Sequence, residues 1–188
     1  MAVNAIQIER KLFTVEEYEK MVAAGVLYED DRLELIQGEI LAMSPIGGLH
    51  IQVVNRLNRL LVGQLQDRAV VSVQNPIRLL NSEPQPDLAI LRPETAKGPA
   101  AVPRSEDVLL VIDVADTTAG YDRAIKVPLY ASNEILEVWL VDVQERVIEV
   151  YRGPAPGRYK RSETLAGADK LAPQAMPDVQ LSVDEILE

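Results

Sequence analysis

Two aspartates occupy positions where a carboxylate could do chemistry. Asp87 follows Pro86 and begins the apolar run 88–91, so we expect it at a strand edge that faces a cleft. Asp113 interrupts the otherwise aliphatic run 108–114, where a carboxylate is costly unless it is paired, hydrogen-bonded by the backbone or bound to a cation. If the two carboxylates converge, each raises the proton affinity of the other, and a divalent cation relieves the conflict. This pattern predicts an Mg²⁺ site that Mn²⁺ could also fill.

Three further polar residues are candidates for the same site. Lys126 shares a predicted helix face with Asp122 and Tyr130, four residues to either side, so it is either part of an ordinary i,i+4 pair or a cationic site group. His50 stands at the start of another predicted helix and is either packed, capping or functional. Strand alternation turns Glu34 away from its apolar neighbours, and its ordinary interpretation is solvent exposure.

The elements that would position these residues follow from periodicity and turn signals. Thr14 and Glu17 form a capping box before the first helix. Helices are predicted at 13–24, 50–66 and 119–132, a hairpin around 33–43, and strands at 71–73, 77–79, 88–91, 108–114, 138–141 and 147–151. This order predicts one α/β domain over residues 1–188 with a mixed sheet, in which 153–188 packs on a core at about 13–152.

Composition excludes several classes of protein. The chain has no cysteine, so metal ligands must be oxygens or the single histidine. It has no P-loop and no glycine-rich dinucleotide motif. The longest apolar run, 108–112, is too short to cross a bilayer, and the N-terminus lacks the apolar segment of a secretion signal. We therefore expect a cytoplasmic protein without a membrane span.

The net charge of −10, from 29 acidic and 19 basic residues, argues against a broad positive surface for nucleic acid. A local basic strip could still serve. Its candidate members are Arg56 and Arg59 on the long predicted helix 50–66, and Arg158, Lys160 and Arg161 near the end. The ordinary interpretation of these residues is solvated surface charge.

Seven short pieces of the chain, taken in order, form a characteristic set. They are 33–40, 43–45, His50, 84–87, 112–114, the trio Asp122, Lys126 and Tyr130, and 137–142. This set resembles the Uma-type family of proposed endonucleases, formerly a domain of unknown function, in the PD-(D/E)XK restriction-endonuclease-like superfamily. The resemblance covers roughly residues 13–152.

The resemblance implies a restriction-endonuclease-like core, with a mixed central β-sheet flanked by helices and preceded by a helix and a hairpin. It implies an Mg²⁺-dependent endonuclease that hydrolyses DNA phosphodiester bonds with metal-activated water. The residues carried over are Asp87, Asp113 and the carbonyl of Val114 as metal ligands, Lys126 as the charge that stabilises the attacking hydroxide or the pentacovalent phosphate, and Glu34 and His50 bordering the metal or orienting water.

The chain departs from the family pattern at three neighbouring positions. Asp113 stands where the family usually has Glu, Ala115 where the superfamily lysine belongs, and Asp116 where similar members carry Ser. Lys126 would therefore have to reach the site from the helix. These departures keep a second hypothesis open, a catalytically degenerate nuclease fold that serves as a binding or assembly module. A third is a hydrolase of another phosphate ester.

A homodimer is the expected assembly, because superfamily members that cut both strands often dimerise. The apolar residues Ile6, Ile8 and Leu12 could form an interface arm, although a frayed tail is the commoner outcome.

Overall fold

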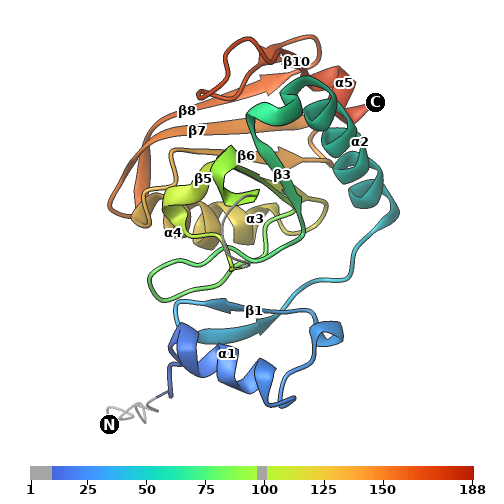
Figure 1. Cartoon of the computed structure of the whole chain (residues 1–188). Helices are drawn as coiled ribbons and strands as arrows, with labels where there is room; N and C mark the ends of the chain where they lie inside the picture. Colours follow the sequence, from blue (N-terminus) through green and yellow to red (C-terminus); the bar gives the residue numbers. More distant parts are fainter. Residues whose placement is uncertain (1–9, 97–100) are drawn as a thin grey trace, which may run out of the picture.

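The structure is a computed structural model that describes residues 10–96 and 101–188. Its helices are α1 (Val15–Ala23), α2 (Gly48–Leu65), α3 (Ala119–Tyr121), α4 (Val127–Ser132) and α5 (Val183–Leu187), and the π-helical turn η5 (Asp122–Lys126) joins α3 to α4. Its strands are β1 (Leu33–Ile36), β2 (Glu39–Ala42), β3 (Val70–Val73), β4 (Leu88–Leu91), β5 (Val108–Ala115), β6 (Glu137–Asp142), β7 (Val147–Ala155), β8 (Arg158–Ala166), β9 (Lys170–Leu171) and β10 (Leu181–Ser182). Short 3₁₀ turns are η1 (Glu29–Asp31), η2 (Gln66–Arg68), η3 (Pro93–Ala96) and η4 (Ser105–Asp107). Figure 1 shows their arrangement.

A mixed six-stranded sheet forms the body of the molecule, in the order β3-β4-β5-β6-β7-β8. All neighbours are antiparallel except β5 and β6, which are parallel. A parallel pair needs a crossover connection, and α3, η5 and α4 supply it. This helical connection therefore lies over one face of the sheet, where α4 contacts β7 and β8.

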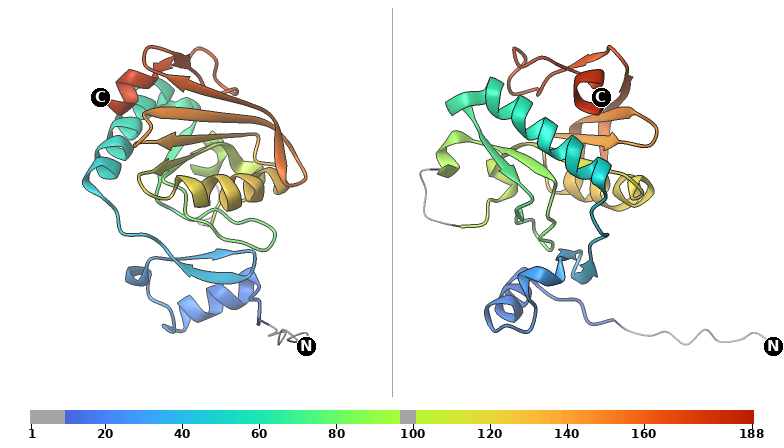
Figure 2. Two further views of the ribbon diagram at one scale, coloured as in Figure 1. Left: turned by 180° about the vertical axis from the view of Figure 1, so that it is seen from behind. Right: turned by 90° about the vertical axis from the view of Figure 1, so that its right-hand side faces the viewer.

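Each face of the sheet has its own hydrophobic core. On one face α2 packs with Leu57 and Leu61 against the sheet, together with the C-terminal residues around Leu181 and Ile186. On the other face α4 packs with Leu129 and the buried Tyr130. Figure 2 shows α2 and α4 on opposite sides of the strands.

The N-terminal residues form a separate small layer of α1 and the β1–β2 hairpin, below the body in Figure 1. The Gln37–Gly38 turn has positive φ at both residues, 51° and 84°, as a type I′ hairpin turn requires. The layer is attached by backbone bonds between Leu35 and Glu83, with N···O distances of 3.4 and 2.7 Å. Gln37 N also donates to Ser82 Oγ at 2.8 Å. These bonds fix the direction in which β1 turns its side chains.

Most predicted elements are confirmed, including the capping box of Thr14 with Glu17 at α1. The strand predicted at 77–79 is wrong: Ile77 and Leu79 are buried but lie outside the strands, and Arg78 makes only an isolated bridge to Arg104. Pro76 precedes this segment. The alternation of apolar residues at 77 and 79 reflects their burial beside the N-terminal layer, in one cluster with Ile36. Strand β8 was not predicted, because its largely exposed, charged sequence lacks apolar alternation.

Among the described residues, no helix combines the length and apolar character that a membrane crossing requires. Of the three residues suggested for a dimer arm, Ile6 and Ile8 lie outside the described residues. Leu12 is 52% exposed. The homodimer stays a prediction.

The α2 face of the core provides a test of the packing. Leu57→Ala removes a side chain that is fully buried between α2 and the sheet, so we expect a loss of about 2–5 kcal/mol in the free energy of unfolding. Val62 lies on the outer side of the same helix and is 51% exposed. Val62→Ala should therefore change the free energy of unfolding by less than about 0.5 kcal/mol. Urea denaturation followed by circular dichroism measures both, and equal losses would contradict this packing.

Candidate active site

Asp87 and Asp113 meet at one end of adjacent antiparallel strands. Leu88 at the start of β4 pairs with Ile112 of β5, so the aspartates just beyond these partners come to the same end of the sheet. Both line a cavity of about 440 Å³. Its lining also includes Arg32, Glu34, His50, Gln85, Val114, Asp116, Thr118, Tyr121, Asp122 and Lys126. The structure therefore brings together every site residue that the sequence predicted.

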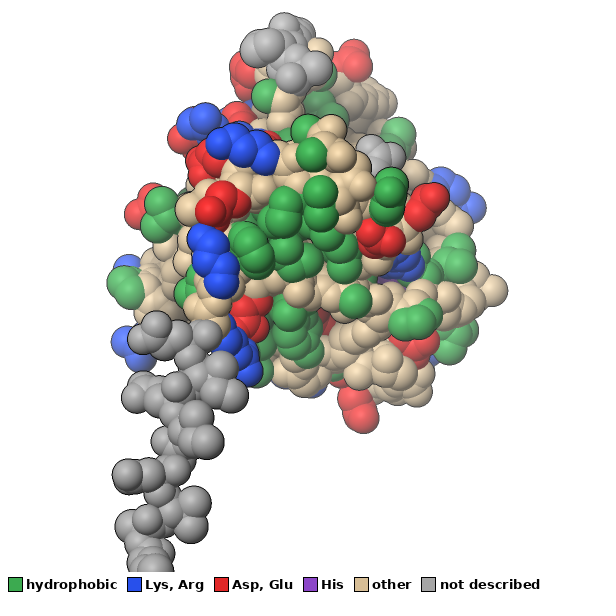
Figure 3. Space-filling model, turned by 90° about the horizontal axis from the view of Figure 1, so that it is seen from below, with side chains coloured by type: hydrophobic (Ala, Val, Ile, Leu, Met, Phe, Trp, Pro, Cys, Tyr) green, Lys and Arg blue, Asp and Glu red, His purple; other side chains and the backbone are tan. Residues whose placement is uncertain are grey.

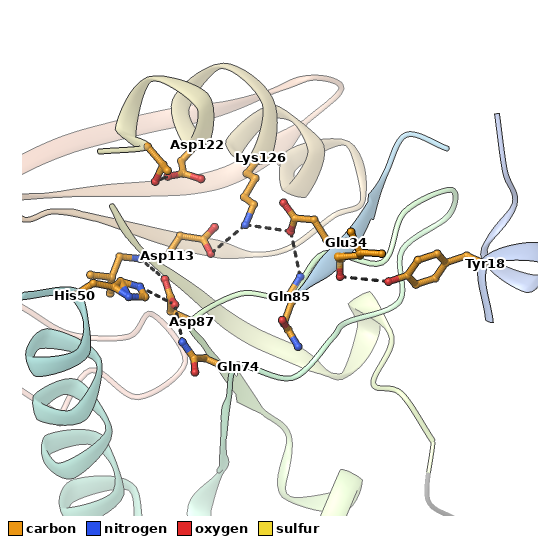
Figure 4. Close-up of polar contacts among 12 residues, drawn as sticks. Tyr18, Glu34, His50, Gln74, Gln85, Asp87, Asp113, Asp122 and Lys126 are labelled. Carbon is orange, nitrogen blue, oxygen red and sulfur yellow. Dashed lines mark hydrogen bonds and ion pairs between the residues drawn. The ribbon is translucent and has the colours of Figure 1, made fainter. Parts of the chain in front are cut away.

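Lys126 projects from η5 toward the two carboxylates that flank it (Figure 4). Its Nζ lies 3.3 Å from Glu34 Oε2 and 3.9 Å from Asp113 Oδ1, and the residue is 7% exposed. Burial alone would lower the pKa of Lys126, but attraction by Asp113 and Glu34 outweighs it and raises that pKa above its ordinary value. The ammonium is therefore charged at neutral pH. The ordinary i,i+4 pair with Asp122 is not among the ion pairs of the described residues.

Glu34 enters the site from the N-terminal layer. It is 4% exposed, so solvent exposure, its ordinary interpretation from strand alternation, is wrong. The face of β1 opposite Leu35 and its neighbours covers the end of the sheet instead of facing water. Gln85 N donates to Glu34 Oε2 at 3.4 Å. Because Pro84 and Pro86 have no N–H, this is the one backbone donor that the Pro-Gln-Pro run can offer.

The two shortest contacts that hold the Asp87 carboxylate come from different elements. Val114 N on β5 donates to its Oδ2 at 2.8 Å, and His50 Nε2 at the start of α2 lies 2.8 Å from its Oδ1. Burial lowers the pKa of His50, so the ring is neutral at pH 7 and the contact is a hydrogen bond. Burial and then repulsion by Asp113 raise the pKa of Asp87 to about 7.

Asp122 is a second buried carboxylate with a raised pKa. It is 5% exposed and accepts from Thr118 Oγ1 at 2.7 Å. Burial and then repulsion by Asp113 raise its pKa to about 7. Pro128 explains the π turn that carries it, because this proline lacks the N–H that would continue a regular α-helical ladder. Pro128 inside the predicted helix was the sequence signal for that irregularity.

The charge of the cavity suits a hard cation. Five carboxylate side chains line it against two basic ones, Arg32 and Lys126. Across residues 10–96 and 101–188 no three His, Asp or Glu side chains form a ready-made metal cage. Mg²⁺, however, commonly takes one or two carboxylates and fills its other positions with water and substrate phosphate. The donor set around Asp87 and Asp113 therefore fits this ion.

Two of the three departures from the family pattern, Ala115 and Asp116, have clear structural settings. Ala115 is fully buried at the end of β5, and the cationic group of the site comes from η5 instead. Asp116 lines the cavity, and its Oδ1 accepts from Gln144 Nε2 at 2.5 Å. A side chain at Gly47 would collide with Asp116, because a Cβ there would lie 2.8 Å from Asp116 Oδ2.

Sequence reasoning missed several residues of the cavity wall, among them Arg32, Gln85 and Tyr121. Arg32 lies in the turn before β1, Gln85 lies between prolines, and Tyr121 belongs to the short helix α3. Burial, followed by the charge of Glu34, raises the pKa of Tyr121 to about 12. The only signal was their closeness in sequence to Glu34, Asp87 and Asp122, because tertiary packing brought them to the cavity.

The raised pKa of Asp87 predicts a pH-dependent stability. The folded protein keeps this proton up to about pH 7, while the unfolded chain releases it near 3.8. The contribution of Asp87 to the free energy of unfolding is therefore fully present below pH 3.8, and it is lost as the pH rises toward about 7. In metal-free buffer, the free energy of unfolding of Asp87→Asn should thus improve relative to the native chain across that range, as measured by urea titrations at several pH values.

Asp178→Asn is the matched control for this titration. Its partner Arg68 lowers the pKa of Asp178 below 3.8, so its contribution stays constant from about pH 4 upward. Parallel pH profiles for Asp87→Asn and the native chain would contradict the raised pKa of Asp87.

Comparisons with known proteins give the chain a family and a fold. The Uma2 family model, described as "Putative restriction endonuclease", matches residues 15–184. No match was found among the curated proteins. A crystal structure of a putative nuclease belonging to DUF820, from Anabaena variabilis, is similar with a TM-score of 0.75 at 16% identity, over 93% of this chain and 97% of that one. The chain therefore belongs to the Uma2 family of putative restriction endonucleases and has their restriction-endonuclease-like fold.

Proposed function

We propose that the protein is an Mg²⁺-dependent endonuclease that hydrolyses DNA phosphodiester bonds. The observation that carries the proposal is the meeting of Asp87, Asp113 and Lys126 in one polar cavity at the end of β4 and β5. Two carboxylates with a fixed ammonium beside them match what phosphodiester hydrolysis needs: a place for a cation and a positive charge for the transition state. Membership of a family described as restriction endonucleases supports the same class of reaction.

Asp87 and Asp113 would hold the ion, with the carbonyl of Val114 as a third ligand. When bound, the ion would supply a Lewis acid that polarises the scissile phosphate and lowers the pKa of a water molecule. His50 and Val114 N fix the orientation of Asp87, so its carboxylate would need little reorganisation to bind the ion.

Lys126 would stabilise the negative charge that builds up on the phosphate. Its ammonium is already held by Glu34 and Asp113, and a buried, preoriented charge stabilises a transition state more than a solvated one does. Glu34 is then the positioning residue that keeps Lys126 at the end of β5. With His50, it borders the ion site and could orient the attacking water.

A catalytically degenerate binding or assembly module is the second candidate. Lys126 is paired with Glu34, and the net charge of −10 disfavours broad contact with DNA. The endonuclease would cleave DNA, whereas the binding module would bind a ligand without cleaving it.

Cleavage of supercoiled plasmid tests the enzymatic proposal. With Mg²⁺ or Mn²⁺ the native chain should nick or linearise the plasmid, and Asp87→Ala and Asp113→Ala should each lower the rate at least about 100-fold, because each removes a ligand of the ion. Asp67→Asn changes an exposed carboxylate in η2, just beyond the end of α2 that is remote from His50, and this variant should cleave like the native chain. Cleavage that survives both alanine substitutions would refute the proposed site.

Ion binding can be measured without turnover. At about 100 times its Kd, Mn²⁺ should stabilise the folded protein by about 2.7 kcal/mol, which raises Tm by several degrees in differential scanning fluorimetry. Asp113→Asn should remove this shift, and Asp67→Asn should keep it. A shift without plasmid cleavage would favour the binding module, and no shift with either ion would contradict the metal site.

A further inference from the structure

A second cavity of about 600 Å³ opens directly beside the candidate active site. Arg32 and Gln85 line both cavities. Gln74 also connects them, because it lines the second cavity while its Nε2 lies 3.4 Å from Asp87 Oδ1. A polymer bound with one phosphate at Asp87 and Asp113 would therefore have its neighbouring unit next to this second cavity.

The lining of the second cavity combines flat apolar surface with amide groups. Its wall on the N-terminal layer contains Tyr18, Val22, Leu27 and Tyr28, and the facing wall contains Gln74, Asn75, Pro76 and Val102. Tyr18 is fixed by its hydroxyl, which donates to Leu33 O at 3.2 Å. Aromatic faces with nearby amides suit a nucleobase, which stacks through its face and hydrogen-bonds through its edge.

Tyr28 is the residue best placed to receive a base. Its side chain is 65% exposed, although its backbone N–H is fixed by Asp31 Oδ2 at 2.9 Å. Seen from below, hydrophobic side chains gather near the centre of the face that the N-terminal layer forms (Figure 3). Val22 on α1 and Val26 just after it are also large apolar residues with exposed side chains. The aromatic ring is thus available to a ligand.

Arg32 supplies the positive charge on the wall that the cavities share. Its guanidinium makes no ion pair among the described residues, whereas the two carboxylates of the second cavity, Glu19 and Glu83, are both paired with Arg78. Arg32 also has a φ of 49°, an uncommon and costly conformation for a large side chain. A guanidinium that lies between two cavities and pairs with no carboxylate in the described part of the chain is suited to bidentate contact with a phosphate.

We propose that the second cavity binds one unpaired nucleotide next to the scissile phosphate, with its base on Tyr28 and its phosphate on Arg32. This proposal rests on the proposed nuclease function and specifies its substrate. A base inside a duplex is stacked and paired and cannot enter a side cavity without leaving the helix. The preferred substrate is therefore a single strand, a flap or a junction rather than an intact duplex.

Fluorescence anisotropy with labelled oligonucleotides in EDTA tests the proposal without cleavage. The native chain should bind a single strand more tightly than the same sequence as a duplex. Tyr28→Ala should weaken binding of the single strand about tenfold, because a base–aromatic stack is lost, and should not change binding of an abasic strand of equal length. Arg32→Ala should weaken both strands to a similar degree, because the phosphate is common to both.

Two control variants separate the cavity from general effects. Tyr28→Phe keeps the stacking face and should bind like the native chain. Lys170→Ala removes an exposed lysine on the distant strand β9 and should leave the preference for single strands unchanged. Thermal melting checks that each variant is folded.

The outcomes for this cavity and for the nuclease are distinguishable. Plasmid cleavage that depends on Asp87, together with equal binding of intact and abasic strands, would overturn the nucleotide cavity while the nuclease proposal stands. Equal loss on both strands for Tyr28→Ala would also overturn the role given to its ring. Failure to bind any oligonucleotide would overturn the cavity, and the plasmid assay would then decide the nuclease proposal by itself.

Discussion

The buried contact of Lys126 with Glu34 and Asp113 is the constraint on which the arrangement of the site depends. The three residues come from η5, the N-terminal hairpin and β5, so one ammonium connects the crossover, the added layer and the central sheet. Removing one partner from such a buried group leaves uncompensated charge and costs several kcal/mol in typical proteins. The N-terminal layer is therefore part of the wall of the candidate active site, because Glu34 reaches this contact from β1.

The topology of the sheet explains why the lysine can come from a helix. Strands β5 and β6 are the one parallel pair of the sheet, and their connection must cross over it. That crossover contains Lys126 and Asp122, and the π turn at this point lets both side chains be buried. With Ala115 fully buried where a lysine would otherwise stand, the cationic group approaches Asp113 from above the sheet instead of from the strand.

Lys126 does not neutralise all the carboxylates of the cavity, and the remaining negative charge affects both protein stability and cation binding. Asp87 and Asp122 both have pKa values raised to about 7, so near neutral pH the cavity is poised between binding protons and binding a cation. The same N-terminal layer that supplies Glu34 to this cavity also supplies Tyr28 to its neighbour. The hairpin and the turn before it thus link the charged site to the surface proposed for the substrate.

The sequence by itself determined most of the elements and the chemical character of the candidate site. Capping at Thr14, apolar periodicity in α2 and the aliphatic residues of β5 are local signals, and a carboxylate at Asp113 is unusual in such a strand. Only the tertiary structure decided that Glu34 is buried, that residues 77–79 form no strand, and that Arg32 and Gln85 separate two cavities. These outcomes depend on contacts between segments such as Leu35 and Glu83, which are distant along the chain. Local periodicity reports only that a side chain is buried or exposed, and it carries no information about which distant segment covers it.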